Sequence, residues 1–171
     1  MQTTITAPEG VAVRAENGSV HAKGPKGELS RAFVHPLLTL SVKENTLTIT
    51  SKDDRKETRA LVGTWRAHLN NMFTGVTQGF ERKMRIVHVH FPMSVKVEGS
   101  KLTVQNLLGQ KNLKIAPIED GVDAKIDGEN IVLNGIDVEK VGQTVSNIEV
   151  ATRLSNRRDR RRFYDGIYAV E

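Results

Sequence analysis

The residues in this sequence best suited to bind another molecule are arginines near the C-terminal end. Residues 153–162 include six arginines and one aspartate, so this segment carries the whole formal net charge of +5. Guanidinium groups form paired hydrogen bonds with phosphate oxygens and also stack on exposed bases. Phe163 and Tyr164 follow directly and Tyr168 is nearby, and aromatic rings stack on unpaired bases. This combination predicts binding to nucleic acid, and to RNA in particular.

We expect the RNA contacts of this segment to come from Arg153, Asn156, Arg157, Arg158, Arg160, Arg161, Arg162 and Tyr164. A solvated helix end or a loose tail is the alternative, because runs of charge usually face water. An anionic membrane surface is a second, less favoured partner for a cationic segment. Arginines this close in sequence repel one another unless a polyanion neutralises them, which favours RNA binding over a solvated end.

Two smaller groups are predicted to add RNA contacts, namely Arg82, Lys83 and Arg85, and Gly109, Gln110 and Lys111. Residues 109–111 combine the N–H groups of a turn with an ammonium, which suits phosphate. Residues 82–85 could bind phosphate or simply keep an edge strand soluble. A turn at 24–27, Gly-Pro-Lys-Gly, could also meet phosphate, but turn chemistry alone explains it and it lacks the spacing of a nucleotide-binding loop.

Catalytic and metal-binding chemistry have little support in the sequence. His88 and His90 are two residues apart, as metal ligands on one face of a strand would be, but there is no cysteine and no recognisable third ligand. The acidic residues are spread over turns, and no Ser-His-Asp pattern has motif context. We therefore expect no enzymatic activity, no metal, no cofactor and no small-molecule substrate. A metal-dependent hydrolase and a free-standing binder of DNA or messenger RNA are the competing hypotheses.

The composition favours a soluble protein with a modest core. Hydrophobic residues make up 38% of the 171 residues and charged residues 26%, which argues against disorder. The absence of cysteine excludes disulfides and fits a reducing compartment. The first residues do not resemble a signal peptide, and no apolar run approaches the ~18 residues of a membrane-spanning helix. These features predict a cytoplasmic protein without membrane contact.

An internal repeat organises the elements that must position these residues. Residues 13–27 resemble residues 95–109 at a constant offset. A strand candidate then recurs, at 45–50 and at 130–134, and an amphipathic helix follows it in both halves. Two copies are too few for a solenoid, so the pattern predicts a tandem duplication of one domain.

Both predicted helices have apolar residues at three- and four-residue spacing. Asp54 followed by Glu57 resembles a capping box at the start of the first helix, and Gly75 is a plausible end. Asp137 is a reasonable N-cap for the second helix. Trp65 is in register with the apolar face of the first helix, so we assign it to the core and not to base stacking.

Gly63 and Gly142 occupy matching places in the two predicted helices. A glycine inside a helix costs ~1 kcal/mol relative to alanine. Its recurrence therefore suggests a purpose, and we expect these glycines to permit close packing of helix on sheet.

Short alternating segments separated by turns predict half-buried antiparallel strands at 11–15, 19–23, 38–43, 84–91, 95–98 and 102–105. The predicted fold class is α+β, with two tandem duplicated domains that each pack a small antiparallel sheet against one α-helix. The domains are expected to span 1–81 and 82–171, the second with an arginine-rich RNA-binding tail.

Four stretches, at 24–29, 64–81, 83–90 and 135–143, resemble the L-six family of large-subunit ribosomal proteins in order and spacing. The most specific part is Leu-Asn-Asn-Met, then Gly-Val-Thr-Gln-Gly-Phe, then a basic strand. The ending Asp165-Gly166-Ile167-Tyr168 is similar to archaeal and eukaryotic members. The lysine-glycine loop of bacterial members is absent, so contacts made by that loop do not transfer to this chain.

The resemblance implies a structural, rRNA-binding constituent of the large ribosomal subunit that supports translation. It implies a place at the base of the factor-binding stalk, where the second domain binds rRNA near the sarcin-ricin loop. The implied partners are large-subunit rRNA, neighbouring large-subunit ribosomal proteins and, close by, translational GTPases.

The path of the chain between residues 149 and 165 has two interpretations. No glycine or proline interrupts it, so the second helix could run on past Ala151 and carry the arginines outward. The alternative is a segment that is loose when free and becomes ordered on binding RNA.

The repeat leads to a prediction about limited proteolysis. Cleavage near residues 79–82 should release two fragments, each with circular dichroism of mixed helix and sheet, because each half has its own apolar helix face. Both fragments should be marginally stable, since small domains bury little surface. If no preferred site is found there and both fragments are unfolded, the two halves are not independent domains.

Overall fold

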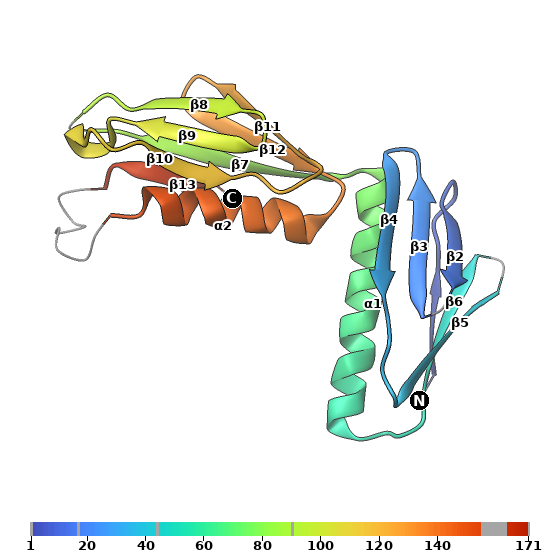
Figure 1. Ribbon diagram of the computed structural model, residues 1–171. Helices are drawn as coiled ribbons and strands as arrows, with labels where there is room; N and C mark the ends of the chain where they lie inside the picture. The colour runs from blue at the N-terminus through green and yellow to red at the C-terminus, as the bar shows by residue number, and fades with distance from the viewer. Residues whose placement is uncertain (1, 17, 44, 90, 155–163, 171) are drawn as a thin grey trace. The chain divides into compact units, whose positions relative to one another are not determined.

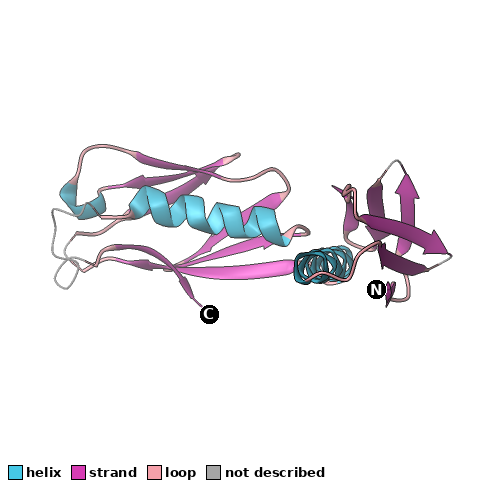
Figure 2. Ribbon diagram, turned by 90° about the horizontal axis from the view of Figure 1, so that it is seen from below, coloured by secondary structure: helices cyan, strands magenta, loops and turns pink. Residues whose placement is uncertain are grey.

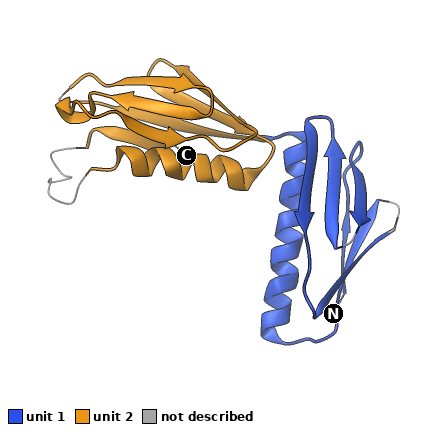
Figure 3. Ribbon diagram, viewed as in Figure 1, with its two compact units in different colours: residues 1–79 blue, residues 80–171 orange. Residues whose placement is uncertain are grey.

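The computed structural model describes residues 2–16, 18–43, 45–89, 91–154 and 164–170. Figure 3 shows its two compact units, Met1–Gly79 (unit 1) and Phe80–Glu171 (unit 2). The division falls close to the domain boundary expected between residues 81 and 82. Independent folding of each part stays a prediction.

Unit 1 contains two antiparallel sheets and one long helix (Figures 1 and 2). The strands of one sheet are ordered β1 (Gln2–Thr6), β6 (Thr46–Ser51), β5 (Leu38–Lys43). Those of the other are ordered β2 (Ala12–Glu16), β3 (Ser19–Gly24), β4 (Gly27–Ala32). Helix α1 (Lys56–Thr77) packs against β3, β4 and β6, so it covers both sheets.

The core of unit 1 follows from the spacing of its apolar residues, every three or four residues in the helix and every second residue in the strands. Apolar residues on one face of α1, such as Trp65 and Leu69, are buried against alternate residues of the strands, such as Leu47 and Ile49. The rings of Trp65 and Phe33 meet edge to face, with centroids 5.3 Å apart. The assignment of Trp65 to the core is therefore confirmed.

Helix α1 begins and ends at residues other than those its capping pattern suggested. Its N-cap is Arg55, which makes no side-chain cap hydrogen bond, so the expected cap at Asp54 is wrong. Asp54 instead accepts hydrogen bonds of 3.0 and 2.9 Å from Arg59, which lower the pKa of its carboxyl group. Gly75 is buried inside the helix and does not end it; Gly79, with a φ of 73°, follows the last turn.

Unit 2 repeats the architecture of unit 1 and adds one strand. Its strands are β7 (Phe80–Val87), β8 (Ser94–Glu98), β9 (Lys101–Gln105), β10 (Lys114–Pro117), β11 (Val122–Asp127), β12 (Asn130–Gly135) and β13 (Gly166–Val170). The sheets are ordered β10-β9-β8 and β11-β12-β7-β13. Strand β7 of unit 2 corresponds to β1 of unit 1. With this correspondence, both sheets of unit 2 repeat the strand order of the sheets in unit 1. Among the described residues of unit 1, no strand corresponds to β13.

The predicted fold class is confirmed, because the structure is α+β and consists of two copies of one arrangement. Each copy has two small sheets where one was expected. The strand expected at 84–91 is β7, which begins earlier and ends at Val87. Strands β1, β4, β10, β11 and β13 were not predicted.

Helix α2 (Val138–Thr152) begins as expected, because the Asp137 carboxylate accepts a 2.9 Å hydrogen bond from the Glu139 N–H. The role expected for Gly63 and Gly142 is wrong. Both glycines lie on the exposed side of their helices, and a Cβ at either would meet nothing outside the helix within 4 Å. The structure gives no packing reason for them.

Helix α2 ends at Thr152, so the expectation that it runs on and carries the arginines outward is wrong. Arg153 already has extended backbone angles, φ −62° and ψ 127°. The outer edge of β13 is bonded to the last turns of α2: the Ile167 N–H donates to Thr152 Oγ1 (3.2 Å) and the Ala169 N–H to Glu149 Oε1 (3.0 Å). The arginine segment is therefore not a C-terminal tail, because it connects α2 to a strand.

Replacing Trp65 with alanine should lower the free energy of unfolding by roughly 3 to 5 kcal/mol, as truncation of a buried aromatic residue does. Chemical denaturation measures this loss. Arg66→Ala, at the neighbouring exposed position, is the matched control and should change stability little. A Trp65→Ala protein as stable as the wild type would contradict the core assignment.

Replacing Thr152 with valine should destabilise unit 2 by about 1 to 3 kcal/mol, because a buried amide then loses its acceptor. The Thr152 side chain is buried, and its hydroxyl also donates to the Ile148 carbonyl at 3.0 Å. Thr152→Ser keeps the hydroxyl and should cost less. Hydrogen exchange of the Ile167 amide should accelerate in the valine variant only; equal exchange in both variants would show that this hydrogen bond does not hold the strand.

Candidate nucleic-acid interface

Two buried residues, one on each side of the undescribed part of the arginine segment, are fixed at one end of unit 2. Leu154 is 8% exposed and Asp165 is 1% exposed. The Asp165 carboxylate accepts a 2.7 Å hydrogen bond from the Val89 N–H, just beyond β7. With the bond between Ile167 and Thr152, this places the start and the finish of the segment close together.

Most of the arginines expected to bind RNA cannot be placed. Asn156, Arg157, Arg158, Arg160, Arg161 and Arg162 lie outside the described residues. Arg153 is exposed and follows the last turn of α2, where a positive charge interacts favourably with the helix dipole. Tyr164 is also exposed, and its carbonyl accepts a 3.1 Å hydrogen bond from the Tyr168 hydroxyl.

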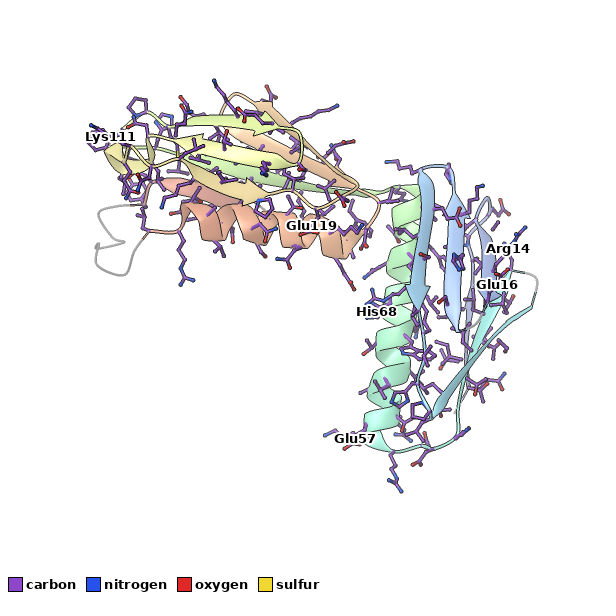
Figure 4. All side chains as sticks on the ribbon, in the orientation of Figure 1. Arg14, Glu16, Glu57, His68, Lys111 and Glu119 are labelled. Carbon is purple, nitrogen blue, oxygen red and sulfur yellow. The ribbon has the colours of Figure 1, made fainter. Side chains whose placement is uncertain are left out.

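The turn at 109–111 lies at the same end of unit 2 as the last turn of α2; Figure 4 labels Lys111 there, and Figure 1 shows both elements. The 3-10 turn η1 (Leu107–Gly109) follows β9. Asn106, Leu108 and Gly109 all have positive φ values, of 61°, 52° and 73°. A positive φ at leucine is uncommon and strained. The backbone of this turn is therefore held by its surroundings.

Contacts with the neighbouring segment 91–93 supply that support. The Asn106 side-chain amide donates a 2.8 Å hydrogen bond to the Pro92 carbonyl, and the Phe91 ring lies 3.5 Å from where a Cβ on Gly109 would stand. Leu107 and Leu108 are buried. Lys111 is exposed just beyond, and among the described residues no carboxylate pairs with it.

Arg82, Lys83 and Arg85 lie on β7, which is flanked by β12 and β13, so the edge-strand explanation for these charges is wrong. Two of the three have acidic partners. Lys83 Nζ is 3.4 Å from a Glu81 carboxylate oxygen, and an Arg85 guanidinium nitrogen is 3.7 Å from one of Glu129. These carboxylates would repel phosphate, so residues 82–85 are less suited to bind it than an unpaired lysine would be.

The turn at 24–27 has a structural role in unit 1. The Lys26 N–H donates to the Val76 carbonyl at 2.9 Å, and the Lys26 ammonium donates to the Gln78 carbonyl. A Cβ on Gly24 would stand 2.6 Å from the Val76 carbonyl oxygen, so only glycine allows this approach. The turn therefore holds the hairpin β3–β4 against the end of α1.

The histidines considered as metal ligands do not form a metal site among the described residues. His88 follows the end of β7 instead of lying within it, and His90 lies outside the described residues. In the described part of the chain, no three His, Asp or Glu side chains are grouped to hold a metal ion. Neither helix among the described residues combines the length and the apolarity needed to cross a bilayer.

Sequence reasoning missed two residues of this end of unit 2, Asp165 and Thr152. Both are buried polar residues with partners elsewhere in the chain, at Val89 just beyond β7 for Asp165 and at Ile167 in β13 for Thr152. The only available signal was the Asp-Gly pair after the arginines, which is typical of a turn that starts a strand.

Comparison with known proteins identifies the family. A profile of the family described as Ribosomal protein L6 matches residues 7–79 and 91–158. Similar curated proteins include the large ribosomal subunit protein uL6 of Methanosarcina mazei, 46% identical over 98% of this chain and 95% of the relative. The uL6 proteins of Aeropyrum pernix (44% identical; 98% of this chain, 92% of the relative) and Natronomonas pharaonis (38%; 100% and 96%) are also similar.

These relatives come from archaea, in agreement with the resemblance seen in the ending at 165–168. The matches span both units and nearly the full length of the relatives. Together with the duplicated α+β architecture, they show that this chain belongs to the ribosomal protein L6 family of structural, non-enzymatic proteins.

Proposed function

We propose that this chain is a structural constituent of the large subunit of the cytoplasmic ribosome and binds large-subunit rRNA through the end of unit 2. The observation that carries the proposal is the hydrogen bond between Ile167 and Thr152. It holds Thr152 and Ile167, which lie on either side of the arginine segment, next to each other. The segment therefore leaves and rejoins unit 2 at one place, and its positive charge belongs to that place. Dense positive charge is the main source of affinity for RNA.

The turn at 109–111 supports the same site. Lys111 is exposed at this end, and Gly109 and Gln110 directly follow a backbone with positive φ at Asn106 and Leu108. A fixed turn loses little entropy when it meets RNA. Residues 82–85 contribute less to RNA binding, because the Glu81 and Glu129 carboxylates partly neutralise their positive charge.

We also propose that the rRNA site lies near the sarcin-ricin loop at the base of the factor-binding stalk, with neighbouring ribosomal proteins and translational GTPases close by. Family membership supports this location, as do relatives named as proteins of the large ribosomal subunit.

Converting Arg157, Arg158, Arg160, Arg161 and Arg162 to alanine should weaken rRNA binding and flatten its salt dependence. Each lost phosphate contact removes about 0.7 to 0.9 from the slope of log affinity against log salt concentration. Arginine-to-lysine changes should weaken binding less, because they keep the charge but lose the paired hydrogen bonds. The measurement is binding, over a salt series, to an rRNA fragment that contains the sarcin-ricin loop.

The matched control removes the same amount of charge from exposed positions of unit 1, at Arg14, Lys23, Lys52, Lys56 and Arg66. The control should retain nearly the wild-type slope. Circular dichroism should show that both variants fold. An arginine-segment variant with unchanged affinity and slope, or a control with the same loss, would refute this end of unit 2 as the principal RNA contact.

A further inference from the structure

A buried carboxylate holds the chain beyond the end of strand β7. The pairing between β13 and β7 begins with Gly166 opposite Val87. Asp165, the residue before that pair, is 1% exposed, and its carboxylate accepts a 2.7 Å hydrogen bond from the Val89 N–H. Burial of a carboxylate is costly, but an ionised acceptor forms short and strong hydrogen bonds. Asp165 therefore fixes backbone that lies outside the sheet.

The same stretch of chain is fastened a second time, to the turn after β9. Three atoms of the Phe91 ring lie 3.5 to 3.7 Å from where a Cβ on Gly109 would stand, so the ring covers that glycine. The Pro92 carbonyl accepts a 2.8 Å hydrogen bond from the Asn106 side-chain amide. The described residues directly after β7 thus join the start of β13 to the turn at 106–111, and both lie at one end of unit 2 (Figure 1).

The turn needs this support, because its own conformation is unfavourable. Asn106 and Leu108 have positive φ, and a strained backbone of this kind persists only where its surroundings hold it. Within the turn, the Gln110 N–H donates a 3.1 Å hydrogen bond to the Leu107 carbonyl. Lys111 follows directly, so the turn sets where its side chain leaves the backbone.

We propose that Asp165 is a positioning residue for RNA binding, which acts on Lys111 through the chain after β7 and the turn at 106–111. The proposal rests on the proposed function, in which Lys111 meets phosphate. A turn that is already fixed loses little entropy on binding, whereas a loosened turn must be ordered by the RNA. Asp165 thus raises affinity, although its negative charge on its own would repel phosphate.

Replacing Asp165 with alanine should weaken binding to the rRNA fragment with the sarcin-ricin loop by roughly 3- to 10-fold, the cost of ordering the turn on binding. The slope of log affinity against log salt should stay the same, because no phosphate contact is removed. Asp165→Asn keeps a carbonyl oxygen for the Val89 N–H and should bind within about 3-fold of the wild type. If Asp165→Ala binds as tightly as the wild type, or more tightly as loss of a negative charge alone would predict, the proposal is overturned.

A double-mutant cycle with Lys111→Gln distinguishes positioning from a general loss of stability. Lys111→Gln alone should lower the salt slope by about 0.7 to 0.9, the value for one phosphate contact. In the Lys111→Gln background, Asp165→Ala should cost at least about 2-fold less affinity than in the wild type, because the contact that it positions is already gone. Losses that simply multiply would show that Asp165 acts independently of Lys111, and the proposal would be wrong.

Hydrogen exchange tests the structural link without RNA. Phe91→Ala removes the ring over Gly109, and the fold should survive because this side chain is 47% exposed. Exchange of the Gln110 amide should accelerate in Asp165→Ala and in Phe91→Ala, while amides in α2 keep their wild-type rates. Ile115→Ala, at a similarly exposed apolar position on β10, is the matched control and should leave the Gln110 amide unchanged.

The outcomes separate this proposal from the proposed function. Phe91→Ala carries the same expectations for affinity, salt slope and coupling to Lys111, so the test remains decisive if Asp165→Ala does not fold. If the arginine-segment variant loses affinity and these variants do not, the positioning proposal is wrong and the proposed function stands. If they lower affinity but accelerate exchange throughout unit 2, they act by destabilising the fold and the positioning proposal is overturned. If the wild-type protein does not bind the rRNA fragment, both fail.

Discussion

The hydrogen bonds between the outer edge of β13 and the last turns of α2 are the constraint on which the candidate site depends. An edge strand presents amide groups that need partners. Here the Thr152 and Glu149 side chains accept hydrogen bonds from the Ile167 and Ala169 amides. Side chains of α2 therefore take the place of a further strand at the edge of the sheet. The same bonds fix both ends of the arginine segment. Stability of the sheet and placement of the charge therefore come from one set of contacts.

The duplication accounts for the position of the arginine segment in the chain. Both units build the same pair of sheets under one helix, and β13 is the addition that unit 2 carries beside β7. The arginine segment lies between the repeated part and this added strand. The turn after the third strand of each unit, β3 in unit 1 and β9 in unit 2, has also diverged. In unit 1 it is held to the end of α1 through Lys26, and in unit 2 it forms η1 and exposes Lys111.

Sequence periodicity predicted both helices, the duplication and most strands, because those features depend on local spacing of apolar residues. It did not predict where the helices end. At the start of α1, Asp54 pairs with Arg59 instead of capping the helix, and at the end of α2 the Thr152 hydroxyl accepts a hydrogen bond from an amide of β13. Strand β13 was missed because an uninterrupted run before it favoured a longer helix. The glycines Gly63 and Gly142 were misread because recurrence was taken as evidence of packing, and both are exposed.

Charge and position make different contributions to recognition at the end of unit 2. Contacts with phosphate supply affinity but carry no information about sequence, so arginines alone would hold the chain to any RNA. Selecting one place on a large rRNA requires groups that meet bases or follow a particular shape of the backbone. Described side chains at this end of unit 2 that are exposed and suited to a base include Arg153 and Tyr164. The bonds between α2 and β13 hold the residues next to these side chains, so a strand edge that needs partners also fixes where on unit 2 such a base would be met.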